Sequence, residues 1–169
     1  MVNKLIHQIA LGVVMLGCVS TAVAAAGEFK QADSFIGIGV TDGTKYETPL
    51  EFEPVFRLGA IFDDKHRVTA NYSHGFSSGV TSIHFAYDYL YPFTQSGNWQ
   101  VFGGGSLGYK FGLYDVNDWT FGGQTGIRYR FSQETSMDFG YRVFDTIDDW
   151  KEYQLGELGN IYISIDFMM

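Results

Sequence analysis

The sequence predicts an all-β protein, an up-and-down antiparallel transmembrane β-barrel of eight strands with a polar lumen filled by side chains. Three observations lead to this prediction. Apolar and polar residues alternate with a period of two over stretches of roughly 10 residues, which is typical of membrane barrels. No apolar run is long enough for a spanning helix, which needs about 20 residues. All five arginines fall on the polar phase of their stretches.

The first element is an export signal. Lys4 precedes an apolar run over residues 9–19 and then the small residues Ala22-Val23-Ala24-Ala25-Ala26, which is the pattern of a secretory signal peptide. We therefore expect residues 1–26 to be cleaved and residues 27–169 to form one barrel domain. Cys18, the only cysteine, lies in the predicted signal. The mature chain is then expected to carry no disulfide or thiol chemistry.

The strands follow in order along the rest of the chain. A first strand near 34–40 is short and its phase is left open by the sequence. Seven further strands are expected at 52–62, 67–73, 82–91, 99–111, 119–131, 137–144 and 160–167. Aromatic residues gather near the strand ends, which indicates a girdle at each membrane interface, although ordinary strand propensity is an alternative. With an even number of strands, both chain ends lie on the periplasmic side.

The placement of charge separates a membrane barrel from a soluble sandwich. A soluble sandwich turns its charged side chains outward and its apolar side chains inward. An arginine on the lipid face of a barrel costs about 2–4 kcal/mol at the bilayer midplane. Because the arginines share a phase with several carboxylates, we expect an ion-pair network in the lumen. Its predicted members are Glu53, Arg57, Arg67, Asp88, Lys110, Arg128, Arg130, Asp138, Arg142 and Asp166.

Four outward connections are expected at 41–50, 75–80, 113–118 and 145–157, and they hold most of the acidic residues. Such a rim suits divalent cations shared with lipopolysaccharide phosphates, because hard cations take carboxylate ligands. A solvated set of polar loops is the alternative. The longest connection combines charge with aromatic area, as in many interfaces, although its aromatic residues could simply extend the strands. Its candidate recognition residues are Asp148, Asp149, Trp150, Glu152 and Tyr153.

A family resemblance rests on three stretches of the second half. These are the glycine-rich 101–109, then 123–130, and, after a polar turn, 137–142. They resemble the outer-membrane protein β-barrel domain family, the small opacity-type and OmpA-like barrels. The run 161–167 resembles the assembly signal of such barrels, although two methionines follow its final aromatic residue. The resemblance implies a bacterial outer-membrane location and contact with the barrel assembly machinery, and it specifies architecture rather than function.

Three classes of function remain. We expect a structural or surface-interaction role, in membrane integrity, adhesion or contact with a host or envelope partner. A narrow pore is less favoured, because an eight-stranded interior is filled by side chains. An enzyme acting on lipid A would need a catalytic group, and His74 with Ser73, Ser77 and Ser78 is the one local candidate for a His-activated serine.

The remaining expectations are absences. The pair Asp148 and Asp149 could suggest an acidic protease, but such proteases need a longer chain with more strands. The sequence has no metal-ligand spacing of paired cysteines or histidines. We therefore expect no cofactor, no catalytic residues, no nucleic-acid partner and a monomeric barrel surrounded by lipid and lipopolysaccharide.

Overall fold

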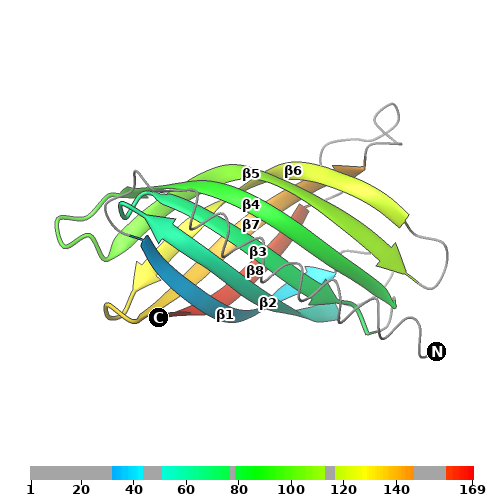
Figure 1. The fold of residues 1–169 in the computed structure, drawn as a ribbon, viewed down its shortest axis with the longest axis horizontal. Coiled ribbons are helices and arrows are strands. Elements are labelled where there is room, and N and C mark those ends of the chain that lie inside the picture. The colour runs from blue at the N-terminus through cyan, green and yellow to red at the C-terminus, as the bar shows by residue number, and fades with distance from the viewer. Residues whose placement is uncertain (1–31, 44–50, 77–78, 113–116, 147–158) are drawn as a thin grey trace.

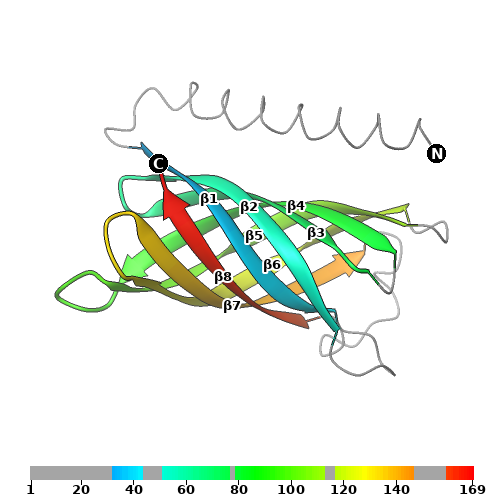
Figure 2. The same cartoon turned by 90° about the horizontal axis from the view of Figure 1, so that it is seen from below.

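A computed structural model of the protein describes residues 32–43, 51–76, 79–112, 117–146 and 159–169, which form a closed barrel (Figure 1). Each strand pairs antiparallel with the next, and β1 pairs with β8 to close the ring (Figure 2). This confirms the predicted up-and-down barrel. The strands are β1 Ala32–Gly43, β2 Glu51–Phe62, β3 His66–His74, β4 Val80–Pro92, β5 Trp99–Gly112, β6 Asn117–Arg130, β7 Thr135–Thr146 and β8 Gly159–Met168.

Several strands are longer than the sequence predicted. β1 continues to Gly43, and β7 runs to Thr146, so parts of the expected outward connections 41–50 and 145–157 belong to strands. β4 and β6 likewise begin inside the expected connections. The reason is that backbone pairing continues past the apolar alternation, as in the ladder pair Asp42 and Phe52. The predicted signal peptide lies outside the described residues, and within those residues no helix is long and apolar enough to cross a membrane.

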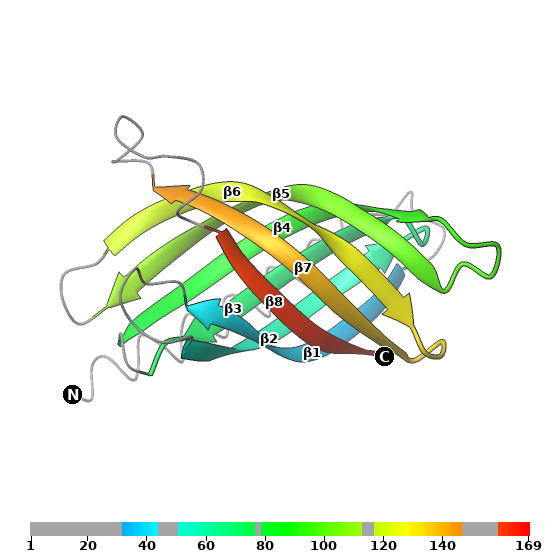
Figure 3. The same cartoon turned by 180° about the vertical axis from the view of Figure 1, so that it is seen from behind.

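One end of the barrel carries three short turns, at 63–65, 93–98 and 131–134 (Figure 3). In the first, Asp63 and Asp64 have φ angles of 51° and 58°, and the N–H of Lys65 donates to the carbonyl of Phe62 at 3.0 Å. Two consecutive positive φ values match the twist of the flanking strands, and aspartate tolerates this conformation. We call this end, where β1 begins and β8 ends, the short-turn end; such turns are periplasmic in bacterial barrels.

The two faces of the wall have opposite chemistry. Phe56 and Leu107 point outward with exposed fractions of 57% and 49%, whereas the inward Arg67 and Asp88 have none of their surface exposed. This arrangement is the reverse of a soluble protein, in which large apolar side chains are buried and charges face water. The phase of the first strand is now defined as well, because Phe35 is buried in the lumen.

Outward aromatic side chains contact one another near both ends of the β5–β6 pair. Near the short-turn end, the ring centroids of Trp99 and Tyr129 are 4.6 Å apart, and those of Tyr129 and Phe131 are 4.9 Å apart. Towards the other end, the rings of Tyr109 and Trp119 are 5.2 Å apart. Amphipathic rings near the ends of membrane-spanning strands are the pattern that a lipid bilayer favours.

Candidate functional site

The lumen holds a group of buried charges that we call the central ion cluster. It joins residues of six different strands, because inward positions of the alternation converge on one interior. Its net charge is zero, since three guanidinium groups face three carboxylates. The members of the central ion cluster are Arg57, Arg67, Asp88, Arg128, Asp138 and Asp166.

Asp138 on β7 is the hub of this cluster. Its Oδ2 accepts hydrogen bonds from Arg67 on β3 and from Nη2 of Arg57 on β2, the latter at 3.2 Å. Its Oδ1 lies 3.9 Å from Nε of Arg128 on β6. A carboxylate taken out of water needs such partners, because an uncompensated buried charge is strongly destabilising. Asp138 therefore ties opposite walls of the barrel together.

The other two carboxylates complete the charge balance. Nη2 of Arg67 lies 2.9 Å from Oδ2 of Asp88, on the neighbouring strand β4. Nη1 of Arg57 lies 3.4 Å from Oδ1 of Asp166 on β8. Glycines make room for these groups. A Cβ atom at Gly104 would overlap with the carbonyl of Tyr87 and the carboxylate of Asp88.

A second group of polar residues extends the cluster away from the short-turn end. Gln124 donates from Nε2 to Asp88 at 2.6 Å and accepts from Nε of Arg142 at 2.8 Å. The guanidinium of Arg142 lies 4.7 Å from the ring centroid of Tyr162 and 5.4 Å from that of Phe144. Gln124, Tyr162 and Phe144 were not among the predicted network residues. Their signal is the inward phase that they share with the arginines.

Four predicted network residues lie apart from the central ion cluster. Arg142 connects to it through Gln124 and through the Tyr162 ring, which Arg57 also faces. Nζ of Lys110 lies 5.7 Å from the Phe144 ring, and Glu53 stands on β2 opposite Thr41 of β1. Arg130 is at the short-turn end, where its Nη1 is 3.2 Å from Oδ1 of the exposed Asp64. The sequence did not indicate Asp64 because it belongs to a turn and not to the alternation.

An apolar layer of the lumen packs beside the ion cluster. Phe35, Ile61, Leu90, Phe102 and Tyr162 form this layer, and Met168 packs against it. Arginines lie over several of the rings: Arg67 is 4.6 Å from the Phe102 centroid. Cationic groups over ring faces are attracted to them. The charged and apolar layers therefore lie side by side in the lumen.

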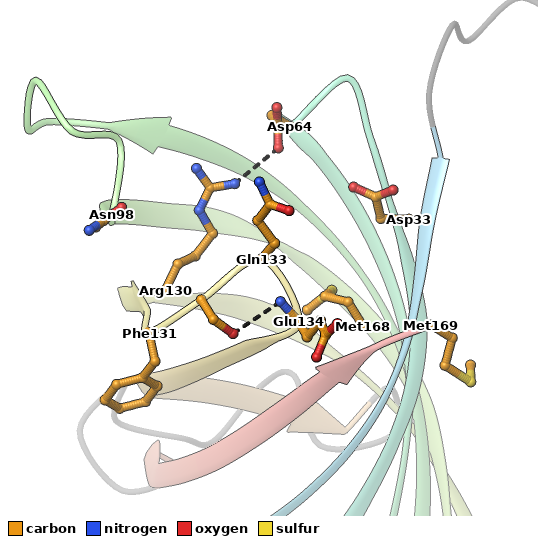
Figure 4. A pocket seen from close by; sticks show the side chains of 10 residues that line it. Asp33, Asp64, Asn98, Arg130, Phe131, Gln133, Glu134, Met168 and Met169 are labelled. Carbon is orange, nitrogen blue, oxygen red and sulfur yellow. Dashed lines mark hydrogen bonds and ion pairs between the residues drawn. The ribbon is translucent and has the colours of Figure 1, made fainter.

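At the short-turn end, a recess of about 730 Å³ opens to solvent (Figure 4). Arg130, Glu134 and Asp64 line its sides, and Met168 lies within it. Three of its lining residues are acidic and one is basic. Even so, the described residues contain no group of three or more His, Cys, Asp or Glu side chains that is placed so that it could hold a metal ion.

The candidate His-activated serine does not form in the described residues. Ser73 lies on the lumen side, where its Oγ is 2.6 Å from Oγ of Ser82. His74 bonds instead through Nδ1 to Oγ1 of Thr81, at 2.9 Å. Consecutive residues of a strand point to opposite faces, so His74 cannot take a proton from Ser73. Ser77, Ser78 and the candidate recognition residues at 148–153 lie outside the described residues.

Comparison with known proteins gives the fold. The solution structure of outer membrane protein H (OprH) from P. aeruginosa in DHPC micelles superposes with a TM-score of 0.57 and 19% identity over 81% of this chain and 99% of that one. The crystal structure of Neisserial surface protein A (NspA) gives 0.52 and 13%, over 82% and 96% of the two chains. The crystal structure of OprG from Pseudomonas aeruginosa gives 0.51 and 12%, over 83% and 97%.

No protein-family model and no curated protein sequence matches this chain. The structural likeness extends over nearly the whole of each neighbour, at sequence identities below 20%. The fold is therefore that of the small outer-membrane β-barrels, as the resemblance in the sequence implied. Function does not follow from a shared fold.

Proposed function

We propose that this protein is an integral barrel of the bacterial outer membrane whose lumen is closed, and that it acts as a structural or surface-interaction protein rather than as a pore. The fold and the outward apolar belt support the location. The observation that carries the rest is the burial of both apolar and charged side chains inside the barrel. Leu90 and Phe102, with exposed fractions of 0% and 2%, stand in the same interior as the fully buried Arg67 and Asp138.

Closure of the lumen argues against conduction. An ion that crossed the barrel would have to pass the apolar layer of Phe35, Ile61, Leu90, Phe102 and Tyr162 and the neighbouring central ion cluster. Passing the cluster would break paired, buried charges, which is costly. With the lumen closed, the parts of the protein free to meet other molecules are its two ends and its lipid-facing wall.

The acidic outward connections are the proposed contact region. Among the described residues, Asp42 lies at the end of the barrel opposite to the short-turn end. Its Oδ1 accepts a hydrogen bond from the N–H of Ile161 at 2.9 Å, which reinforces the pairing of β1 with β8. The sequence places further carboxylates beside Trp150 and Tyr153 in the same region. Carboxylates facing the phosphates of lipopolysaccharide need bridging divalent cations, so we propose cation-dependent contact with this lipid. We also propose insertion by the barrel assembly machinery.

Two measurements test the two halves of this proposal. Single-channel recording of the purified barrel in planar bilayers is expected to show no stepwise conductance, and regular steps would contradict closure. Binding of the barrel to lipopolysaccharide vesicles, with and without Mg²⁺, tests contact at the outward end. The double variant Trp150→Ser and Tyr153→Ser is expected to bind less while unfolding at the same urea concentration. Unchanged binding with lost stability would make these aromatic residues a structural cap.

A further inference from the structure

Five buried polar residues meet in the part of the lumen nearest the short-turn end, and we call them the polar corner. They are neighbours in the strand register: Gln100 pairs with Arg128, Arg128 with Asp138, and Ser136 with Asp166. None is more than 3% exposed. The corner comprises Gln100, Arg128, Ser136, Asp138 and Asp166.

Each member of the polar corner has a polar atom that lacks a hydrogen bond within the described residues. These atoms are Oε1 of Gln100, Nε of Arg128, Oγ of Ser136, Oδ1 of Asp138, and Oδ1 and Oδ2 of Asp166. Buried polar groups are otherwise almost always bonded, to protein or to ordered water. Other unbonded buried atoms lie elsewhere among the described residues, on Arg57, Arg67, Thr69, Asn71, Ser106 and Tyr162. These six differ in belonging to residues that are neighbours in the strand register, which points to a shared ligand.

The spacing of the atoms fits water. Nε of Arg128 and Oδ1 of Asp138 are 3.9 Å apart, which is too far for a direct hydrogen bond. A polar contact of this length is one that a water molecule can bridge, accepting from the guanidinium and donating to the carboxylate. The other orphaned atoms include hydrogen-bond acceptors on three more side chains, which water can serve as a donor.

The charges of the site argue against a metal cation, the other small ligand that oxygen atoms attract. Five of the six orphaned atoms are oxygens, the ligand type of hard cations. The three arginines of the central ion cluster already neutralise its three aspartates, however, so an added cation would lie beside guanidinium groups with no charge to balance it. A neutral ligand that both donates and accepts satisfies the corner without this repulsion.

Met168 contacts both the recess and the polar corner. Its side chain lies in the recess at the short-turn end, packs against the apolar layer, and places its sulfur 3.9 Å from Nη2 of Arg128. Arg130 and Glu134 also line the recess. Arg130 pairs with the corner residue Ser136 in the strand register, and Glu134 precedes Ser136 by two residues. Methionine is unbranched and adapts its shape readily.

We infer that the polar corner is a site for buried water molecules, and that these exchange with solvent only at the short-turn end, through the recess and past Met168. The barrel is then hydrated from the short-turn end as far as the Arg128–Asp138 pair. This inference is independent of the surface role proposed above. It concerns solvent access to the ion cluster and leaves the lumen closed to ions.

Cysteine labelling tests the access route. In a chain that lacks residues 1–26, and therefore Cys18, Ser136→Cys introduces a single thiol. The side chain keeps nearly its original volume. It is expected to react with methyl methanethiosulfonate, a small uncharged reagent, the thiolate taking the reagent's methylthio group and releasing methanesulfinate. Adding Met168→Trp is expected to abolish labelling by filling the entrance, whereas Phe167→Trp, at the adjacent outward position that does not line the recess, leaves it unchanged. Labelling that is absent from Ser136→Cys, or that persists with Met168→Trp, would overturn the access route.

A measurement on the unaltered protein avoids variants that fail to fold. Magnetisation transfer from water in nuclear magnetic resonance is expected at the Nε–H of Arg128. Arg67 is the internal control, because its Nε–H donates to Asp88 at 3.0 Å and is fully buried. A water contact at Arg128 but not at Arg67 supports the site, and its absence from Arg128 contradicts it. A high-resolution structure showing a cation in the corner would also contradict it.

Discussion

The guanidinium of Arg57 and the carboxylate of Asp138 meet across the lumen, with Nη2 and Oδ2 3.2 Å apart, although 81 residues separate them in the chain. They come from β2 and β7, which are not neighbours in the wall. The contact therefore braces the barrel from within, in addition to the hydrogen bonds that join adjacent strands. Because Asp138 also binds Arg67, one carboxylate supports three strands.

Asp138→Asn tests how much these ion pairs contribute to the stability of the barrel. The change keeps the shape of the side chain but leaves three arginines facing two carboxylates in a buried site. Loss of one partner of a buried pair costs about 3–5 kcal/mol. We expect a loss of this size in the free energy of unfolding, measured by urea titration in lipid vesicles. The matched control is Asp64→Asn, whose half-exposed pair with Arg130 is worth about 0–1 kcal/mol. Equal losses in the two variants would contradict the brace.

Two adjacent glycines give a test of the wall geometry. A Cβ at Gly104 points into the lumen and would overlap with the carbonyl of Tyr87, whereas a Cβ at Gly105 would point to lipid, 3.7 Å from the carbonyl of Gly122. Gly104→Ala is expected to destabilise the barrel by about 1–3 kcal/mol through overpacking. Gly105→Ala is expected to be neutral or to stabilise it by about 0.5–1 kcal/mol, because glycine weakens strands. Heat-modifiable migration on gels ranks the pair, and the reverse order would refute the assigned faces.

Arginine substitutions at two outward positions test whether the outer face of the barrel contacts lipid. Leu107, midway along β5, is 49% exposed, and Phe131, in the turn after β6, is 57% exposed. Leu107→Arg is expected to cost about 2–4 kcal/mol because it lies near the bilayer midplane, and Phe131→Arg about 0–1 kcal/mol because it lies at the interface. Unfolding in lipid vesicles measures both. In a soluble sandwich neither outward arginine would carry this penalty, so similar small effects would speak against a bilayer around the barrel.

The alternation in the sequence predicted the fold because each side chain's face follows from its parity along a strand. That rule placed Arg57, Arg67 and Arg128 in the lumen. It could not pair Arg57 with Asp138, because contacts across the barrel depend on the stagger of all the strands between them. It also could not place strand ends, since polar residues such as Asp118 continue the ladder without continuing the pattern.

The packing of large aromatic side chains inside the lumen was also not predicted from the sequence. Phe144 and His84 stack in the lumen with centroids 4.1 Å apart, and Tyr162 packs against Arg142. Parity identifies the inward position of such a residue but says nothing of its size or of the glycine that accommodates it. The match between Tyr162 and Gly140, where a Cβ would lie 2.5 Å from the ring, is visible only once the strands are in register.

The seam between β1 and β8 bears on how the barrel forms. Oγ1 of Thr41 reaches the carbonyl of Ile161 at 3.1 Å across a separation of 120 residues. Contacts so remote in sequence make a slow, high contact order topology. Until β8 is present, the sheet has two open edges, whose unpaired backbone groups lipid cannot satisfy. A partly inserted chain is therefore not a stable intermediate in the bilayer, and closure of the ring coincides with entry of the final strand.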